Sequence, residues 1–342
     1  MIRRIKHAST ATCTLPIYMG FLMTEPNSIS CTQLAETYNI SHDSVNRFLE
    51  REDYTPHDLY QEAIQHIDNN KLIVSIDDTV LDKPYSQHMD LVSYFWSGKH
   101  HRSVKGINLI TLYATDQNGQ NIPINFRIYD KSEGKTKNDY FMDMLSEVLS
   151  WGAKIQFITG DSWYSSTGNL KTIRKYGIRF MFGIDCNRKV SPEKGQWFQL
   201  RLLPNFHQGQ VVWLKDFGFV QLFKTQLKEQ QRFYIVYQDE DDLLSFEGFH
   251  ELHSSHWKIE QYHRVIKQVC HIEKFQVRRS KLILNHIFSA LMAYVEIQKN
   301  QFERIFENVY RWQKKLFRPM IKNFIDDFIL DKNHLLPQRI YK

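Results

Sequence analysis

The chain has 342 residues, 42% of them hydrophobic, and a formal net charge of +6, enough for a large core divided into two or more structural units. No segment approaches the roughly 20 apolar residues that cross a bilayer. The apolar stretch 15–23 is broken by Pro16 and lacks a cleavage site of small residues, so we exclude a membrane protein and reject a signal peptide. The four cysteines are scattered, which fits reduced thiols of a cytosolic protein rather than zinc ligands.

Residues 1–70 are predicted to be helical, with an amphipathic helix over 53–70, and 32–49 has the pattern of a helix-turn-helix. Asn39 suits a left-handed turn and Ser41 an N-cap between two short helices. The expected inner residues are Leu34, Ala35, Tyr38, Val45, Phe48 and Leu49, and the expected outward residues are Ser44, Asn46 and Arg47. We interpret 1–70 as a DNA-binding region in which Arg47 faces DNA. An ordinary helical hairpin fits the pattern equally well.

Two apolar strands that end in acids follow in the chain. Residues 71–78 end with Asp77 and Asp78, and 154–161 end with Asp161, as expected for buried strands with carboxylates at their tips. Between them, the sequence predicts a hairpin of 106–115 and 121–129 with an Asn-Gly turn, and a helix over 138–151. A helix over 167–176 and a strand over 178–184 complete the first part of a core, 71–186.

The pattern of residue types in the sequence changes after the last of these strands. Residues 187–245 alternate turn residues with aromatic and β-branched runs, which predicts a β-rich antiparallel insertion. The expected strands are 197–202, 211–214, 217–223 and 232–237. Residues 246–342 are predicted to be helical, with helices over 257–270, 280–299 and 302–328. From Trp257 onward, 17 Lys and Arg stand against 8 Asp and Glu; this surplus is compatible with a polyanion partner, or with a merely basic surface.

The helix expected over 257–270 carries Glu260 on a basic face. The basic residues at helical spacing around this glutamate are His253, His256, Arg264 and Lys267. Alone, such a pattern indicates an exposed, salt-bridged helix face. The two acids predicted at strand ends upstream favour a different interpretation of Glu260. A site built on those two acids requires a third carboxylate, which Glu260 could supply.

Three carboxylates on adjacent strand tips and a packed helix suit phosphodiester chemistry. Attack by water or by a 3′-hydroxyl is assisted when two Mg²⁺ ions, roughly 3.5–4 Å apart, stabilise the attacking and leaving oxygens. Such hard cations prefer oxygen ligands. The order of strand, hairpin, helix, strand with acid, helix, strand and late acidic helix is also that of an α/β, ribonuclease-H-like mixed sheet flanked by helices.

The motifs IDDT at 76–79, GDSWY at 160–164 and WKIE at 257–260, followed by Lys267, resemble those of the DDE transposases of bacterial insertion sequences. The resemblance covers about residues 70–300. It is nearest to the group with a β-rich insertion and a Tyr-Arg-Glu-Lys signature. It implies binding of terminal inverted repeats, cleavage by activated water, and transfer of the freed 3′-hydroxyl ends to target DNA. It also implies a homodimer that pairs two DNA ends in a bacterial, nucleoid-associated cytoplasmic protein.

The resemblance assigns roles to individual residues. Asp77, Asp161 and Glu260 would be the catalytic acids, holding two Mg²⁺ ions for which Mn²⁺ may substitute. Asp78 remains the alternative for the first acid. Lys267 would hold a phosphate of the transposon end, with Arg264 beside it, whereas His253 and His256 replace the signature's tyrosine and arginine. A histidine donates only weakly to phosphate at neutral pH unless its pKa is raised.

Aromatic residues leave one further question open. Trp197 or Trp213 in the insertion could stack on a flipped base, as an aromatic does in relatives, although strand tryptophans more often pack in a core. Trp163 and Tyr164, after the second acid, are expected to pack in the core or the wall of the site. Two other functions stay open: a nuclease of the same fold that cuts without joining, and a DNA-binding regulator with an inactive core.

Overall fold

A computed structural model describes residues 12–25, 29–98, 100–227, 230–238 and 243–333. The helices are α1 (Leu15–Thr24), α2 (Cys31–Tyr38), α3 (His42–Arg51), α4 (Pro56–Ala63), α5 (Lys137–Ser150), α6 (Thr167–Lys175), α7 (Phe246–Gln268), α8 (Ser280–Phe302) and α9 (Val309–Asn333). The strands are β1 (Leu72–Asp82), β2 (Ser93–Ser97), β3 (Arg102–Thr115), β4 (Asn121–Ile128), β5 (Ile155–Gly160), β6 (Arg179–Ile184), β7 (Lys189–Ser191), β8 (Phe198–Gln199), β9 (Gln210–Leu214), β10 (Gly218–Leu227) and β11 (Gln230–Tyr237).

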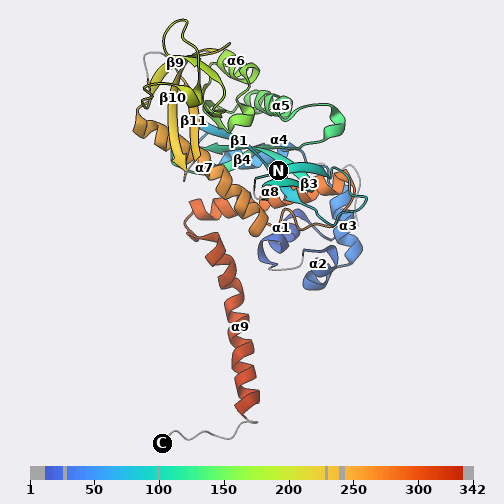
Figure 1. The fold of residues 1–342 in the computed structure, drawn as a ribbon. Coiled ribbons are helices and arrows are strands. Elements are labelled where there is room, and N and C mark those ends of the chain that lie inside the picture. Colours follow the sequence, from blue (N-terminus) through green and yellow to red (C-terminus); the bar gives the residue numbers. More distant parts are fainter. Residues whose placement is uncertain (1–11, 26–28, 99, 228–229, 239–242, 334–342) are drawn as a thin grey trace, which may run out of the picture.

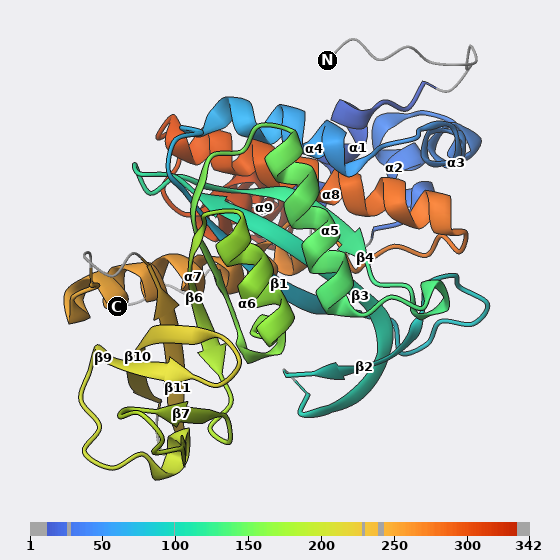
Figure 2. The same ribbon diagram turned by 90° about the horizontal axis from the view of Figure 1, so that it is seen from above.

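One mixed sheet forms the centre of the molecule. Its strand order is β2-β3-β1-β5-β6-β11-β10-β9-β7-β8, and β4 pairs with β3. Strand β1 is antiparallel to β3 and parallel to β5, which is parallel to β6. Helices α5 and α6 lie on one side of this sheet and α7 on the other (Figures 1 and 2). The predicted α/β sheet flanked by helices is therefore confirmed.

The β-rich insertion extends the core sheet. Strand β11 pairs antiparallel with β6, from Phe233 opposite Ile184 to Tyr237 opposite Phe180. The strand expected over 197–202 is wrong in part, because β8 is followed at once by a 3₁₀ turn, Leu200–Leu202. The sequence also missed the short strands β2 and β7. The insertion thus shares one hydrogen-bonded framework with the acid-bearing strands.

The two short helices and the turn that the sequence predicts within 32–49 are present in the N-terminal region. Asn39 between α2 and α3 is left-handed, with φ 52°, and the Ser41 side chain caps α3. Two residues differ from the prediction. Tyr38 is 57% exposed, and Ser44 is buried. The hydroxyl of Ser44 accepts hydrogen bonds from the N–H groups of Thr12 and Cys13, so it fastens the preceding segment to α3 instead of facing outward.

Helix α8 holds the N-terminal helices against the core. The buried Asn285 side chain donates to the carbonyls of Leu49 and Glu52 and accepts from the N–H of Tyr54. The Tyr18 hydroxyl lies 2.8 Å from Nδ1 of His286 on the same helix. These buried polar contacts fix α1 and α3 to α8, because breaking them would leave unsatisfied groups in the interior.

Helix boundaries differ from the predictions at three places. Helix α4 is shorter than the helix expected over 53–70, α7 begins at Phe246 rather than near Trp257, and α9 starts at Val309 rather than at 302. The four cysteines are free of disulfide bonds, as expected. Within the described residues, each helix is too short or too polar to span a membrane.

Candidate active site

The strands β1 and β5 bring two acids to the edge of the sheet at which β5 ends. The prediction that the first strand also ends there is wrong, because β1 continues past Asp77 and Asp78 to Asp82. Ile76 pairs with Gly160 in parallel register, so Asp77 and Asp161 are the next residues on two neighbouring strands. Asp161 leaves the sheet there and caps a 3₁₀ turn, Ser162–Tyr164, by accepting a hydrogen bond from the N–H of Trp163 at 2.9 Å. Parallel strands lie about 4.8 Å apart, so the register alone places these two carboxylates near each other.

Two glycines make this close approach sterically feasible. A Cβ on Gly160 would lie 2.6 Å from a ring carbon of Phe182 and 2.8 Å from Cγ2 of Ile76. A Cβ on Gly183 in β6 would lie 3.0 Å from the backbone nitrogen of Ser162, beside the backbone of Asp161. The position of Asp161 thus depends on the absence of a side chain at Gly183, which the sequence analysis missed.

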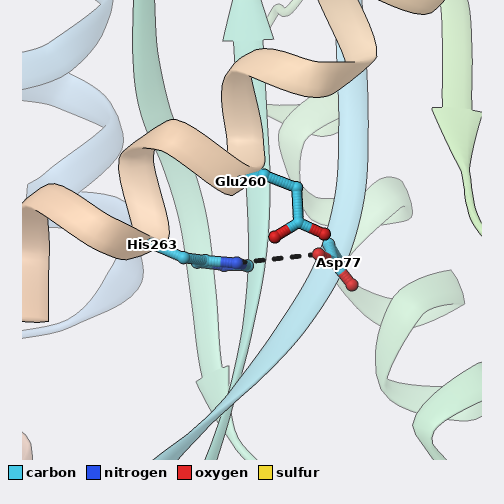
Figure 3. Close-up of side chains that lie close together, drawn as sticks. All are labelled: Asp77, Glu260 and His263. Carbon is cyan, nitrogen blue, oxygen red and sulfur yellow. Dashed lines mark ion pairs between the residues drawn. The ribbon is translucent and has the colours of Figure 1, made fainter. Parts of the chain in front are cut away.

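Helix α7 carries the third acid over the same edge. Its buried residues Ile259, Tyr262 and Ile266 face the core. Three ligand atoms, one each from Asp77, Glu260 and His263, lie within 4.8 Å of one another (Figure 3). His263 was not predicted, although its place three residues after Glu260 puts it on the same helix side. Asp161 is not a member of this trio, but its charge acts on Asp77.

The pleat of β1 separates the two adjacent aspartates. Successive strand side chains point to opposite faces, so Asp77 faces α7 and Asp78 faces the other side. Oδ2 of Asp78 accepts from Asn108 at 2.6 Å and pairs with Lys137 at 2.7 Å, and Oδ1 accepts from the Tyr164 hydroxyl at 3.0 Å. Both oxygens of Asp78 are therefore engaged with protein groups, a geometry that favours Asp77 as the acid of this strand.

Burial shifts the protonation of the acids. Desolvation, followed by the charges of Asp161, Asp78 and Glu260, raises the pKa of Asp77 well above its usual value. Desolvation and the charge of Asp78 raise the pKa of Asp161 to about 6. Glu260 is open to solvent on one side, yet partial burial still raises its pKa. Crowded, desolvated carboxylates of this kind hold protons until a cation replaces them.

His263 is neutral at pH 7 in this site. It is buried, and desolvation lowers its pKa to about 3, so its 3.6 Å approach to Asp77 is not a salt bridge between charged groups. Its Nε2 atom is buried without a hydrogen-bond partner among the described residues. The carboxylates of Asp77 and Glu260 supply the oxygen ligands that Mg²⁺ prefers, whereas an imidazole is better suited to transition-metal ions. The two carboxylates therefore fit the metal that the sequence implied.

The basic residues predicted to contact DNA lie in different settings. His256 is hydrogen-bonded to Thr159 at 3.1 Å, and burial lowers its pKa to about 4. His253 lies 3.0 Å from the hydroxyl of Tyr234, and burial lowers its pKa as well. Both histidines therefore make internal contacts, and their pKa is lowered rather than raised, which argues against a strong contact with phosphate at pH 7.

The other predicted DNA contacts remain on the surface or close to it. Lys267 is half-buried and donates to the carbonyl of Val80 at 2.7 Å, which ties α7 to β1. Arg264 is exposed near Glu260, and Arg47 is exposed on α3. On α7, the exposed guanidinium of Arg264 is thus better placed for DNA than Lys267.

Of the four aromatic residues considered for the site, one is buried and three are partly exposed at the surface. Tyr164 is fully buried, as expected, but Trp163 is 62% exposed. Trp197 and Trp213 are each less than half exposed, and Trp213 lines a cavity of about 620 Å³ in the insertion. Neither insertion tryptophan is a core residue.

Comparison with known proteins identifies the family. Residues 68–295 match the family described as transposase DDE domain. None of the curated proteins compared with the chain matches it. A solved structure of Marinitoga piezophila Argonaute, in complex with 5′ OH guide RNA and target DNA, is 9% identical and matches 71% of this chain and 32% of that chain, with a TM-score of 0.22. So low a TM-score carries no argument.

The family match covers more than half of the chain and contains all three predicted acids. It supports a transposase-type nuclease that acts on DNA with divalent metal ions. The chain belongs to the transposase DDE domain family.

Proposed function

We propose that the protein is a metal-dependent DNA transposase that binds the terminal inverted repeats of its element, cleaves the DNA and joins the 3′-hydroxyl ends to target DNA. The observation that carries this proposal is the convergence of Asp77, Glu260 and His263 beside Asp161, at one edge of the sheet, in a chain of this family. Two carboxylates whose ligand oxygens lie within 4.8 Å of each other are suited to hold a divalent ion against a phosphate.

In this proposal Asp77, Asp161 and Glu260 are the catalytic acids. Asp77 and Glu260 hold two Mg²⁺ ions with Asp161, and Mn²⁺ substitutes for Mg²⁺. When bound, these ions lower the pKa of water and stabilise charge on the attacking and leaving oxygens. Asp78 acts from the opposite face of β1, where its contacts with Lys137 and Tyr164 orient the turn after Asp161.

The proposed partners are double-stranded DNA and a second copy of the chain. Arg264, about one helical turn after Glu260 on α7, contacts a phosphate of the transposon end. Arg47 on α3 contacts DNA outside the site. Two subunits pair the two ends of the element at the bacterial nucleoid. The exposed Trp213 is available to stack on an unpaired base.

A strand-transfer assay tests the proposal. Purified protein is incubated with Mg²⁺, a target plasmid and DNA carrying the inverted repeats that flank its coding region. Joined product that disappears in the Glu260→Gln variant supports transposition. Cut ends without joined product would instead identify a nuclease of the same fold. Specific binding without cleavage in either Mg²⁺ or Mn²⁺ would identify a DNA-binding regulator.

A further inference from the structure

Strands β2 and β3 form a hairpin that carries two exposed aromatic rings. Tyr94 is 65% exposed and Trp96 is 66% exposed, whereas Phe95 between them is buried. Tyr94 pairs with Lys105 and Trp96 with Ser103. Because successive side chains of a strand alternate between its two faces, both rings stand on the same face of the hairpin. Figure 2 shows β2 at the margin of the molecule, so this face is open to a large partner.

The hairpin is held from its other face. The ring of Phe95 lies 5.8 Å from that of Tyr129, between ring centroids. The ammonium group of Lys131 lies 4.8 Å from the centre of the Phe95 ring and donates to the carbonyl of Tyr94 at 2.9 Å. The two exposed rings therefore rest on a fixed support, which lowers the entropy lost when a partner binds to them.

The surface around the rings is basic. Residues 91–115 contain two Lys and one Arg but no Asp or Glu. Arg102 is exposed near the turn of the hairpin, and the exposed Lys131 lies at its opposite end. The nearby acids make other contacts, since Asp82 pairs with a histidine of the turn at 3.0 Å and Asp130 caps the 3₁₀ turn that contains Lys131. Exposed aromatic rings between cations are typical of surfaces that bind single-stranded nucleic acid.

We propose that this face of the hairpin binds single-stranded DNA, with one base stacked on Tyr94 and the next base on Trp96. The two residues stand about 6.6 Å apart along β2, at ~3.3 Å per residue. That distance is roughly twice the ~3.4 Å between nucleotides in a duplex strand. A strand with a base on each ring must therefore be stretched and unstacked, which excludes a base pair of intact duplex DNA as the occupant. Arg102 and Lys131 contact its phosphates at the two ends of the hairpin.

A protein partner fits this surface less well. Ser103 and Lys105 lie beside the rings on the same face, so the rings are set among polar side chains and form no continuous apolar patch of the kind that marks a protein contact. Stacking on an aromatic ring also tolerates any base sequence, because every base has a π-face. The hairpin is thus suited to an unpaired strand whose sequence varies.

Strand β3 connects the hairpin with the acids. Ser103 lies opposite Trp96 and Thr111 lies opposite Asp77, so the two positions on β3 are at most about 26 Å apart at ~3.3 Å per residue. A strand stretched to ~6.6 Å per nucleotide covers this distance in about four nucleotides. The inference rests on the proposed function for the source of the strand, which would be an end freed by cleavage at the acids.

Fluorescence anisotropy tests the proposal with the full-length chain in EDTA. The probes are a dye-labelled oligothymidine of about 20 nucleotides and a duplex of the same length without inverted repeats. Tyr94→Ala and Trp96→Ala should each weaken binding of the single strand by roughly tenfold and binding of the duplex by less than about twofold. Trp96→Phe keeps a ring and should stay within about threefold of the wild type. Tyr176→Ala removes another exposed ring, after α6, and should bind both probes like the wild type.

The phosphate contacts are tested by salt dependence. Arg102→Gln should reduce the slope of log affinity against log salt for the single strand by about 0.7, the effect of one lost contact. Unchanged binding of the single strand by both alanine variants, or equal losses for the single strand and the duplex, would overturn the proposal. Thermal unfolding at the wild-type temperature ensures that each loss reflects a lost contact. Because the assay contains no metal, inverted repeat or target, its failure would leave the proposed transposition intact, and a failed strand-transfer assay would leave this binding intact.

Discussion

The Nδ1 atom of His263 lies 3.6 Å from the Oδ2 atom of Asp77, although the two residues are 186 positions apart in the sequence. The distance exceeds that of a hydrogen bond. It suits two atoms that face one shared ion, since ligands at ~2.1 Å from a cation stand up to about 4.2 Å apart.

This geometry predicts a metal-selective effect of His263→Ala. Imidazole is a better ligand for Mn²⁺ than for Mg²⁺, so the variant should lose roughly tenfold in Mn²⁺ affinity and much less in Mg²⁺ affinity. Calorimetric titration of the metal-free protein measures both. His207→Ala, in the insertion and away from the acids, is the matched control. Equal losses for the two ions would show that His263 acts through packing alone.

Glu260→Gln should abolish cleavage and joining while leaving DNA binding within a few-fold of wild type. Glutamine keeps the size of the side chain but removes the charge that would hold the cation, whereas Lys and Arg contacts to phosphate supply most of the affinity. Glu251→Gln, an exposed residue earlier on α7, is the control and should cut normally. Cleavage by Glu260→Gln near the wild-type rate would remove this residue from the site.

Gly183→Ala should lower both stability and activity, because the added methyl group meets the backbone of Asp161 and Ser162. We expect a loss of about 1–3 kcal/mol in the free energy of unfolding. The cleavage rate should fall by roughly tenfold, since a misplacement of ~1 Å can cost about 100-fold. Gly168→Ala is the control. Its nearest atom would be the Ser166 hydroxyl at 4.0 Å in helix α6, so it should stabilise slightly. Equal behaviour of the two variants would refute the steric argument.

The stability of the metal-free protein should depend on Asp161 between pH 4 and pH 6. The pKa of this carboxyl is about 6 in the folded protein and 3.8 ordinarily, so the folded state binds the proton more tightly. The stability contribution is present below pH 4 and is lost as the pH rises to 6. Asp161→Asn should remove about 3 kcal/mol of that decline, as measured by urea unfolding in EDTA. A parallel pH profile for the variant and the wild type would place Asp161 in a solvated setting.

The Arg264→Ala and Lys267→Ala variants should differ in how strongly their DNA binding depends on salt concentration. Arg264→Ala should weaken DNA binding and reduce the slope of log affinity against log salt by about one, the result of one lost phosphate contact. Lys267→Ala should mainly reduce stability, by about 1–2 kcal/mol, since it removes the hydrogen bond to Val80. Binding titrations at several salt concentrations and thermal unfolding measure the two effects. A reduced slope for Lys267→Ala alone would restore the role that its position in the motif suggests.

The sequence predicted the acids better than it predicted their surroundings. Asp77, Asp161 and Glu260 were expected to converge because strands and helix faces have a local periodicity that places side chains, although β1 continues past Asp77 to Asp82. The choice between Asp77 and Asp78 could not be made locally, since it depends on which face of β1 is covered by α7. The sequence gives that relation only through packing between segments far apart in the chain.

The surroundings of His253 and His256 also depend on packing between distant segments, which the sequence did not reveal. His253 and His256 precede the helix expected over 257–270. In the structure α7 begins at Phe246, and its packing on β11 and β5 turns both histidines toward Tyr234 and Thr159. Their burial, and hence their lowered pKa, follows from this tertiary contact. His263 had a readable spacing from Glu260, but its depth in the protein could not be inferred from spacing alone.

The pairing of β11 with β6 fixes the distance between the acids and the insertion across the sheet. From Asp161 at the end of β5, four strand-to-strand steps through β6, β11 and β10 reach Trp213 on β9. At ~4.8 Å a step this amounts to roughly 19 Å. The interval cannot stretch without breaking backbone hydrogen bonds. A nucleic acid that contacts both Asp161 and Trp213 must therefore adapt its own shape to this fixed distance across the sheet.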